Sequence, residues 1–339
     1  MPLLSTRGGG SIFGFGYGGG AKEPYDGNFN LKLVNLPDLT ANNRGFHTPY
    51  SNINAHTNVS NSNGTAYPGF GGGAAPVGMT MPKPGFFNFI LPAGSYNVTI
   101  QGGSGSGENH GNYRRFSTNI TAFNQVDVLC MPGIHGGGAY SGGGMSGIFL
   151  GNDYSNINGT NTVLVVGGGG GGYSSHVSNY AKVPDMDTNA ADNAGYNQTR
   201  LGTSGGVYDG GAAVLANYTV ETSSNANTIA AQHVVQGALG GRGVDCGGGP
   251  NANNGDSGGF GGGGGECPGG GGGWVGGYPG GNSPNFHAGG AGRNYYKTSG
   301  NLAVSAAHIA TNANSNLTNN SQTNYDSGES GYIQIVGPN

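Results

Sequence analysis

Residues Val163–Gly172 have the sequence VLVVGGGGGG, in which four aliphatic residues run directly into six glycines. A short aliphatic run rich in valine is typical of a buried strand. The six glycines have no side chains to bury, so this half of the stretch needs another source of order. Because blocks of this kind recur along the chain, the way in which they are ordered decides the fold.

Glycine dominates the whole chain. Of its 339 residues, 76 are glycine and 16 are proline, while only 8% are charged and the net charge is −4. Nucleic-acid binding requires a concentration of basic residues, and only 12 Lys and Arg are spread over this chain, so we exclude that function. No apolar run approaches the roughly 20 residues of a membrane-spanning helix. We therefore expect neither a nucleic-acid partner nor a membrane span.

A glycine-rich chain can be collagen-like, disordered or folded around its glycines. Collagen is excluded because the glycines occur in blocks and not at every third position. Charge-driven disorder is excluded by the low charge, whereas neutral disorder remains an alternative. Strand patterns between the blocks favour a fold, as in the aromatic Phe86–Ile90 and the alternating Tyr96–Ile100. Further strand patterns are Val126–Leu129, Ile148–Leu150, Thr162–Val166 and Tyr332–Val336.

Polyglycine II is one way to order the glycine blocks. This helix has three residues per turn, a rise of about 3.1 Å and no internal hydrogen bonds. Its outward-pointing N–H and C=O groups must therefore bind neighbouring helices, which lie close because no side chains separate them. We predict a mainly β fold with a polyglycine II helix bundle, almost no α-helix and long polar loops. The predicted scaffold residues are Gly167, Gly168, Gly169, Gly170, Gly171, Gly172, Gly261, Gly262, Gly263, Gly264, Gly265, Gly269, Gly270, Gly271, Gly272 and Gly273.

Changes in composition divide the chain into three parts. Residues 1–45 are an N-terminal Gly/aromatic segment, and residues 46–85 are an Asn/Ser/Pro-rich extended connector. Residues 86–339 form a glycine-rich β/polyglycine II domain with polar insertions at 173–235 and 294–328. The chain has no fixed repeat, so we do not predict a solenoid.

Tyrosine is abundant in the polar insertions. It is favoured in binding loops because it offers a large contact area for only two side-chain torsions. The alternative is that each tyrosine packs over glycine strands as part of the core. The candidate binding residues are Tyr180, Tyr196, Tyr208, Tyr218, Tyr295 and Tyr296.

Motifs for catalysis are weak in this sequence. The Asp256–Ser257 pair in GDSGG is similar to the nucleophile segment of chymotrypsin-type proteases, and Ser305–His308 is similar to their histidine segment. The chain order of the two is reversed, and the abundance of glycine makes such strings common by chance. We therefore expect a protein that is not an enzyme and needs no cofactor.

Two further groups of residues could bind a cation or form a disulfide. Asp185, Asp187, Asn189 and Asp192 resemble half of a calcium loop that lacks the required glycine and bidentate glutamate, so a solvated turn is the alternative. Three cysteines allow at most one disulfide. If the protein ends outside a cell, Cys246 and Cys267 are the candidate pair, because they share one glycine-rich stretch.

Three stretches carry a resemblance to known glycine-rich domains. They are Phe87–Gly102 (FNFILPAGSYNVTIQG), Gly258–Gly277 (GGFGGGGGECPGGGGGWVGG) and Ser330–Val336 (SGYIQIV). The stretch Val163–Gly172 belongs with them. Together they resemble the glycine-rich ectodomain module of anaplastic lymphoma kinase and leukocyte tyrosine kinase receptors over about residues 86–339. The same kind of polyglycine core occurs in tail-fibre-tip adhesins of T-even-type bacteriophages, whose loops contact the host receptor.

The N-terminal segment Ser5–Ser11 and the following Gly-Phe-Gly resemble the start of phage virion structural proteins. These resemblances imply a non-enzymatic virion surface protein, a tail or capsid fibre or adhesin. It would bind other virion proteins through its N-terminal segment and a host surface receptor through its loops, as part of a larger assembly. Met1–Arg7 has no export signal, which agrees with a virion surface protein that becomes extracellular on release. The alternatives are a structural subunit of a filament, sheath or extracellular matrix, and a secreted receptor-type binding module.

Overall fold

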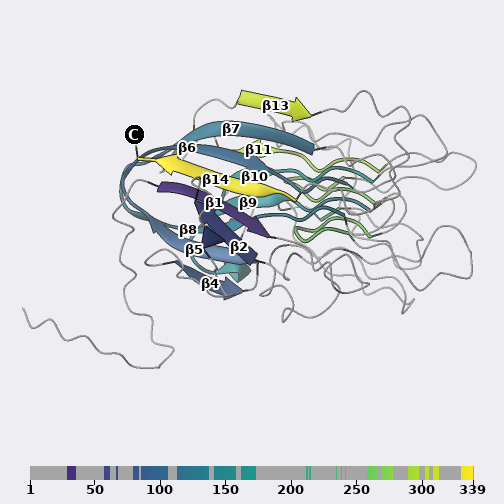
Figure 1. The fold of residues 1–339 in the computed structure, drawn as a ribbon, viewed down its shortest axis with the longest axis horizontal. Coiled ribbons are helices and arrows are strands. Elements are labelled where there is room, and N and C mark those ends of the chain that lie inside the picture. Colours follow the sequence, from purple (N-terminus) through teal and green to yellow (C-terminus); the bar gives the residue numbers. More distant parts are fainter. Residues whose placement is uncertain are drawn as a thin grey trace, which may run out of the picture.

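The computed structural model consists of a β-sandwich with glycine-rich segments extending from one end (Figure 1). In the residues that the structure describes, the prediction of a mainly β fold with little helix is confirmed. The structure describes residues 29–35, 57–61, 66–67, 79–83, 85–105, 113–136, 141–157, 162–172, 211–212, 214, 234, 238, 241, 258–265, 269–277, 289–297, 302–304, 308–312 and 330–338.

The first sheet has eight antiparallel strands in the order β12-β7-β6-β14-β1-β2-β3, with β13 also paired to β7. Its central strands alternate: Val98 and Ile100 are buried, Asn97 is exposed and Thr99 is half-buried. One face of this sheet therefore covers the core and the other is polar. The strands are β1 (Phe29–Asn35), β2 (Thr57–Asn61), β3 (Ala66–Tyr67), β6 (Gly94–Gln101), β7 (Tyr113–Ala122), β12 (Leu302–Val304), β13 (His308–Asn312) and β14 (Tyr332–Gly337).

The second sheet has six antiparallel strands in the order β11-β10-β9-β8-β5-β4. Its four central strands, β10, β9, β8 and β5, are largely buried on both faces, which explains why they are mostly apolar. The strands are β4 (Thr80–Lys83), β5 (Phe86–Leu91), β8 (Val126–Met131), β9 (Ser146–Leu150), β10 (Val163–Gly167) and β11 (Tyr295–Tyr296). A 3-10 helix, η2 (Tyr154–Asn156), follows β9. Within the described residues, no helix is long and apolar enough to cross a membrane.

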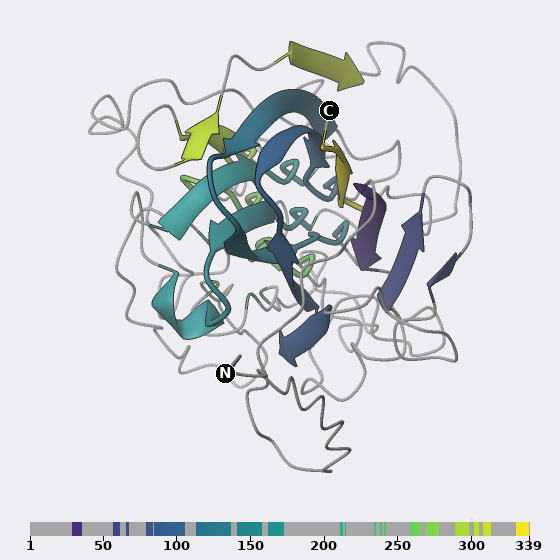
Figure 2. The same ribbon diagram turned by 90° about the vertical axis from the view of Figure 1, so that its left-hand side faces the viewer.

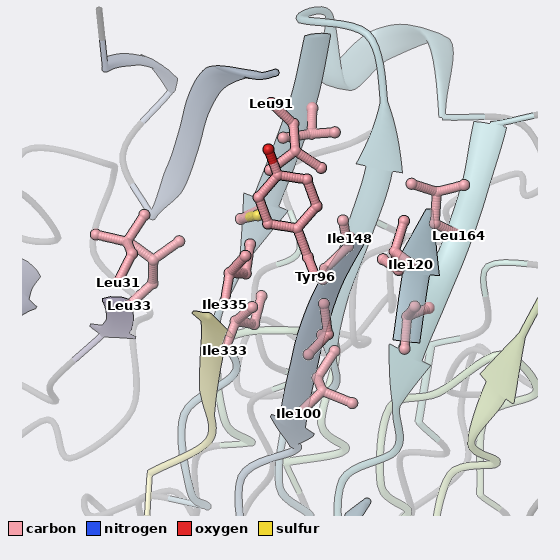
Figure 3. Packing of buried hydrophobic residues seen from close by; sticks show 14 of the residues in the cluster. Leu31, Leu33, Leu91, Tyr96, Ile100, Ile120, Ile148, Leu164, Ile333 and Ile335 are labelled. Carbon is pink, nitrogen blue, oxygen red and sulfur yellow. The ribbon is translucent and has the colours of Figure 1, made fainter. Parts of the chain in front are cut away.

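Two hydrophobic clusters hold the sheets together. The first cluster lies between the sheets, with Tyr96 at its centre near Ile120, Ile148 and Ile335 (Figure 3). The Tyr96 hydroxyl donates a hydrogen bond to the Pro92 carbonyl at 2.8 Å, and burial raises the pKa of the phenol to about 12. The second cluster covers the opposite face of the six-stranded sheet. It contains Phe86, Leu129, Met131, Ile134, Met145, Phe149, Ile157, Val163, Val166, Ala212, Val214, Val234, Ala238, Phe260, Trp274 and Val275.

The sheets do not follow the three-part division expected from composition. Strand β1 belongs to the predicted N-terminal segment, yet it lies between β14 and β2 in the eight-stranded sheet. Leu31 and Leu33 alternate along it and fill the first cluster. Strands β2, β3 and β4 lie in the predicted connector and pair with both sheets. Burial of these side chains makes residues 29–35 part of the same core as the domain from residue 86 onward.

The second predicted insertion, 294–328, also differs from a polar loop. It begins with β11, which pairs with β10, and continues through β12 and β13, which pair with β7. Pairing with existing strands satisfies the backbone hydrogen bonds of these short segments. Residues 294–297, 302–304 and 308–312 therefore extend the two sheets.

Candidate functional site

Glycine-rich segments continue the strands of both sheets beyond the same end of the sandwich (Figure 1). Strand β6 continues into residues 102–105, β8 into 132–136 and β10 into 168–172, while 141–145 lead into β9 and 330–331 into β14. Figure 2 looks along the long axis from the strand end and shows segments of this kind end-on. The sandwich and the glycine segments thus share one axis.

Backbone hydrogen bonds join glycine segments that are far apart in the sequence. Gly143 N donates to Gly170 O at 2.9 Å, and Gly170 N donates to Gly103 O at 3.0 Å. Gly103 N in turn donates to Gly144 O at 2.8 Å, which returns to the first segment. The three segments that contain Gly103, Gly143 and Gly170 are therefore each hydrogen-bonded to the other two.

The same type of bond adds the later glycine blocks. Gly169 N donates to Gly272 O at 2.7 Å, and Gly292 N donates to Gly169 O at 2.9 Å. Further along, Gly172 N donates to Gly269 O at 2.8 Å. These bonds satisfy main-chain groups that would otherwise be buried without partners, because all the predicted scaffold glycines are buried.

The segments lie too close together for any side chain between them. A Cβ atom placed on Gly169 would overlap the Gly143 carbonyl oxygen, and one on Gly143 would overlap the Gly103 carbonyl oxygen. A Cβ atom on Gly272 would overlap the carbonyl oxygen of Gly261. At these positions glycine is therefore required by the close approach of neighbouring backbones.

Ser146 links the sandwich to the glycine segments. Its hydroxyl accepts a hydrogen bond from Gly133 N at 2.8 Å and donates one to the Gln101 carbonyl at 2.6 Å. The side chain is fully buried where β6, β8 and β9 pass into their glycine segments. No sequence pattern marks this serine, because its partners are main-chain atoms from two other strands.

Replacing Ser146 with alanine is expected to lower the free energy of unfolding by about 2 kcal/mol, because a buried donor and a buried acceptor lose their partner. Equilibrium urea denaturation would measure the change. Ser95, half-buried on the outer face, is the control: its hydroxyl has one hydrogen-bond partner, Thr121 Oγ1 at 3.2 Å, and its alanine variant should cost less than about 1 kcal/mol. Equal losses in the two variants would contradict the linking role of Ser146.

Aromatic side chains pack where the glycine segments meet the sandwich, on the side of the second cluster. The Trp274 ring stacks on Tyr295, with 3.9 Å between centroids and 11° between the planes, and Phe260 packs edge-on against Phe86 at 5.8 Å. Next to Tyr295, the Asn294 side-chain oxygen accepts a hydrogen bond from Gly168 N at 2.6 Å. Within the part of the chain that the structure describes, Trp274 Nε1 and Asn294 Nδ2 are buried donors without a partner.

The structure locates two of the six candidate tyrosines. Tyr295 and Tyr296 form β11 and are half-buried: Tyr295 packs on the second cluster and Tyr296 on the first. Burial raises the pKa of the Tyr295 phenol. Both therefore have the packing role that the sequence leaves open as the alternative to binding. The predicted residues that lie outside the described part of the chain are Tyr180, Tyr196, Tyr208, Tyr218, Asp185, Asp187, Asn189, Asp192, Cys246 and Cys267.

Cys130 is a free cysteine in the first cluster and is fully buried. Burial raises the pKa of its thiol, so the nucleophilic thiolate is disfavoured in the folded protein. We expect iodoacetamide to modify Cys130 at pH 8 only after denaturation, as measured by peptide mass mapping. Rapid labelling of Cys130 in the native protein would contradict the packing of this cluster.

The glycine segments end at a common level far from the sandwich, which we call the distal end. Gly172, Gly269 and Gly289 lie there side by side, since Gly172 N donates to Gly269 O and Gly289 N to Gly172 O. The chain leaves or re-enters the bundle at this level many times. The connections that begin there are residues 106–112, 137–140, 173–210, 242–257, 266–268 and 278–288.

The sequences of these connections are acidic. They hold eight acidic and three basic residues, a net charge of −5, whereas the whole chain has a net charge of −4. The acidic residues are Glu108, Asp185, Asp187, Asp192, Asp209, Asp245, Asp256 and Glu266, and the basic ones are Lys182, Arg200 and Arg242.

Comparisons with known proteins do not supply a family. No protein-family model matches the chain, and a search of curated proteins finds no match. The candidate site is the distal end. There the hydrogen-bonded glycine segments stop, and the longest polar connection, 173–210, begins after Gly172.

Proposed function

We propose that this chain is a non-enzymatic recognition protein of a virion surface, a fibre or fibre-tip adhesin that presents polar loops to a host receptor. The observation that carries the proposal is that the two ends of the fold differ in structure. The β-sandwich is at one end, and the repeated chain connections, including residues 173–210, begin at the other. Function commonly resides on loops that a rigid scaffold holds in place.

The proposal treats the glycine segments as a polyglycine II bundle. Such helices have no internal hydrogen bonds and are held by lateral ones. Gly169 N donates to Gly272 O and Gly170 N to Gly103 O, so successive glycines bind two different segments, which supports this assignment. A bundle of this kind is stiff, because moving one segment breaks bonds to several neighbours at once.

Stiffness matters for recognition because it lowers the entropy lost on binding. Loops anchored on a rigid frame have fewer conformations to lose than loops on a mobile one. Tyr180, Tyr196 and Tyr208 fall within residues 173–210, and they are the tyrosines that we propose contact the receptor. Tyr218 lies beyond that connection and Tyr295 and Tyr296 lie in the sandwich, so these three are weaker candidates.

Replacement of residues 175–208 by a 12-residue Gly/Ser linker tests the proposal. A flexible linker of this length spans about 19 Å on average, enough to join neighbouring segments of the bundle. We expect the thermal unfolding transition to move by only a few degrees and binding to cells to be lost. The measurement is flow cytometry of fluorescently labelled protein on a panel of whole bacterial cells.

The matched control is Asn119→Ala, which changes an exposed residue on the outer face of the sandwich. It should leave both the unfolding transition and cell binding unchanged. If the wild-type protein binds cells and the linker variant binds equally well, recognition does not reside on this connection. Binding lost in Asn119→Ala would instead place recognition on the sheet.

A further inference from the structure

The outer face of the eight-stranded sheet carries a row of polar side chains that crosses four strands. Strands β1, β14, β6 and β7 lie side by side in this sheet (Figure 1). Lys32 of β1 pairs with Gln334 of β14. Gln334 pairs with Thr99, which pairs with Ser117. The chain neighbours of these four residues are buried inside the sandwich, so the four side chains lie on the outer face, where all are half-buried.

Tyr332, in the next row of the same face, holds two cationic side chains. Arg115 Nη1 donates a hydrogen bond to the Tyr332 hydroxyl at 2.9 Å. Arg115 and Tyr332 both pair with Gln101, so the arginine side chain reaches across β6 to make this bond. Lys32 Nζ lies 4.3 Å from the centroid of the Tyr332 ring, which is a cation–π contact. One phenol therefore positions a guanidinium and an ammonium over the same strand, β14.

Two cations held by one tyrosine favour an anionic partner. Like charges on one face repel each other, and an anion bound between them offsets the repulsion. A guanidinium and an ammonium both donate charge-assisted hydrogen bonds to carboxylates. Because Tyr332 already positions both groups, little side-chain entropy is lost when an anion binds. The described residues of β1, β14, β6 and β7 include no Asp or Glu, so these strands supply positive charge and no carboxylate.

The polar row beside the cations indicates which kind of anion fits. The Thr99 and Ser117 hydroxyls, hydrogen-bonded to each other at 2.8 Å, and the Gln334 amide can both donate and accept, as sugar hydroxyls do. An acidic protein segment would instead need an apolar centre for its interface. Among the described apolar residues on the outer side of these strands are Val34 and Val336, and both are half-buried. The face therefore suits an acidic sugar chain better than an acidic protein.

We propose that the outer face of the eight-stranded sheet binds an acidic polysaccharide, with a sugar carboxylate between Lys32 and Arg115 above Tyr332. Hydroxyl groups of the same sugar chain bind the row that contains Thr99 and Ser117. A flat face buries little of a ligand, so this contact is too weak to retain the protein on cells by itself. The inference concerns the sandwich and does not depend on receptor binding by residues 173–210.

Isothermal titration calorimetry of the full-length protein with a short oligogalacturonate, in which every sugar carries a carboxylate, tests the inference. We expect saturable binding that weakens as the sodium chloride concentration is raised. Lys32→Gln and Arg115→Gln should each weaken binding at least about tenfold, the effect of losing a charge-assisted hydrogen bond. Lys297→Gln is the matched control and should bind like the wild type. It removes the same charge from a half-buried side chain beside the other sheet, where the Lys297 main-chain N–H donates to Leu164 O.

The inference is overturned if the wild type gives no binding heat, or if Lys32→Gln and Arg115→Gln bind like the wild type. Equal binding of uncharged maltohexaose would remove the role of the cations, and equal binding of hexaglutamate would assign the face to an acidic peptide. Thermal unfolding of each variant reports whether it is folded, and Lys32→Gln decides the outcome if Arg115→Gln is unstable.

The linker variant of residues 175–208 separates this inference from the proposed function. It should bind the oligogalacturonate like the wild type while failing to bind cells. Loss of oligogalacturonate binding in the folded linker variant would place the polysaccharide site on that connection and overturn its assignment to the sheet.

Discussion

Gly169→Ala protein is expected to lose most of its stability, with the free energy of unfolding lowered by more than about 4 kcal/mol. The new methyl group would overlap the Gly143 carbonyl oxygen, which cannot move without separating two segments. Separation would stretch the hydrogen bonds from Gly169 N to Gly272 O and from Gly292 N to Gly169 O. Overpacking alone costs about 1–3 kcal/mol, and loss of buried hydrogen bonds adds to it.

Gly167→Ala is the matched control, two residues earlier, at the last residue of β10. A Cβ atom there would lie 3.1 Å from Gly102 N and 3.2 Å from Ile100 Cγ1, so a shift of a few tenths of an ångström accommodates it. We expect a loss of about 1 kcal/mol or less. Urea denaturation followed by the fluorescence of Trp274, the sole tryptophan, measures both variants. Equal stability of the two would contradict the close packing of the glycine segments.

The strands and the role of the glycine blocks could be predicted because both depend on local sequence. Phe86–Ile90 and Tyr96–Ile100 have strand patterns, and the structure has β5 and β6 there. Their difference in pattern also indicates burial on two faces for β5 and one for β6. Glycine in blocks, with no side chains, leaves close backbone approach as the remaining source of order.

Pairing across the chain could not be predicted in the same way. Strand β1 pairs with β14, about 300 residues later, and nothing near Leu31 or Leu33 indicates that partner. Strands β12 and β13 are short, and their pairing with β7 supplies the order that their own sequence lacks. Long-range contacts of this kind follow from the shared core and not from local preference.

The placement of the sandwich turns and the glycine connections at opposite ends of the molecule could not be predicted from the sequence either. It follows from strand direction, because β6, β8 and β10 run toward the glycine segments while β9 and β14 return from them. An antiparallel arrangement places the turns of the sandwich at one end and the connections of the bundle at the other. The turn after β7, at residues 123–125, therefore lies at the opposite end from Gly172, where the described part of the β10 extension stops, although no sequence motif indicates either position.

Trp274→Ala protein is expected to lose about 4 kcal/mol of unfolding free energy. The indole is fully buried in the second cluster, and replacing a buried tryptophan with alanine costs about 3–5 kcal/mol. The variant also loses the stacking on Tyr295. Because Trp274 lies where the glycine segments meet the sandwich, its loss should weaken both parts together. Far-UV circular dichroism during urea denaturation measures the change without relying on tryptophan fluorescence.

Trp274→Phe separates the two contributions of the indole. Phenylalanine retains an aromatic ring for stacking but removes the Nε1–H group, a buried donor that has no partner among the described residues. Leaving such a donor unsatisfied costs about 1–3 kcal/mol, so its removal offsets much of the lost volume. We therefore expect Trp274→Phe to cost about 1 kcal/mol or less. If it is as costly as Trp274→Ala, the indole N–H is contributing a hydrogen bond, and the junction is held by polar contact as well as by packing.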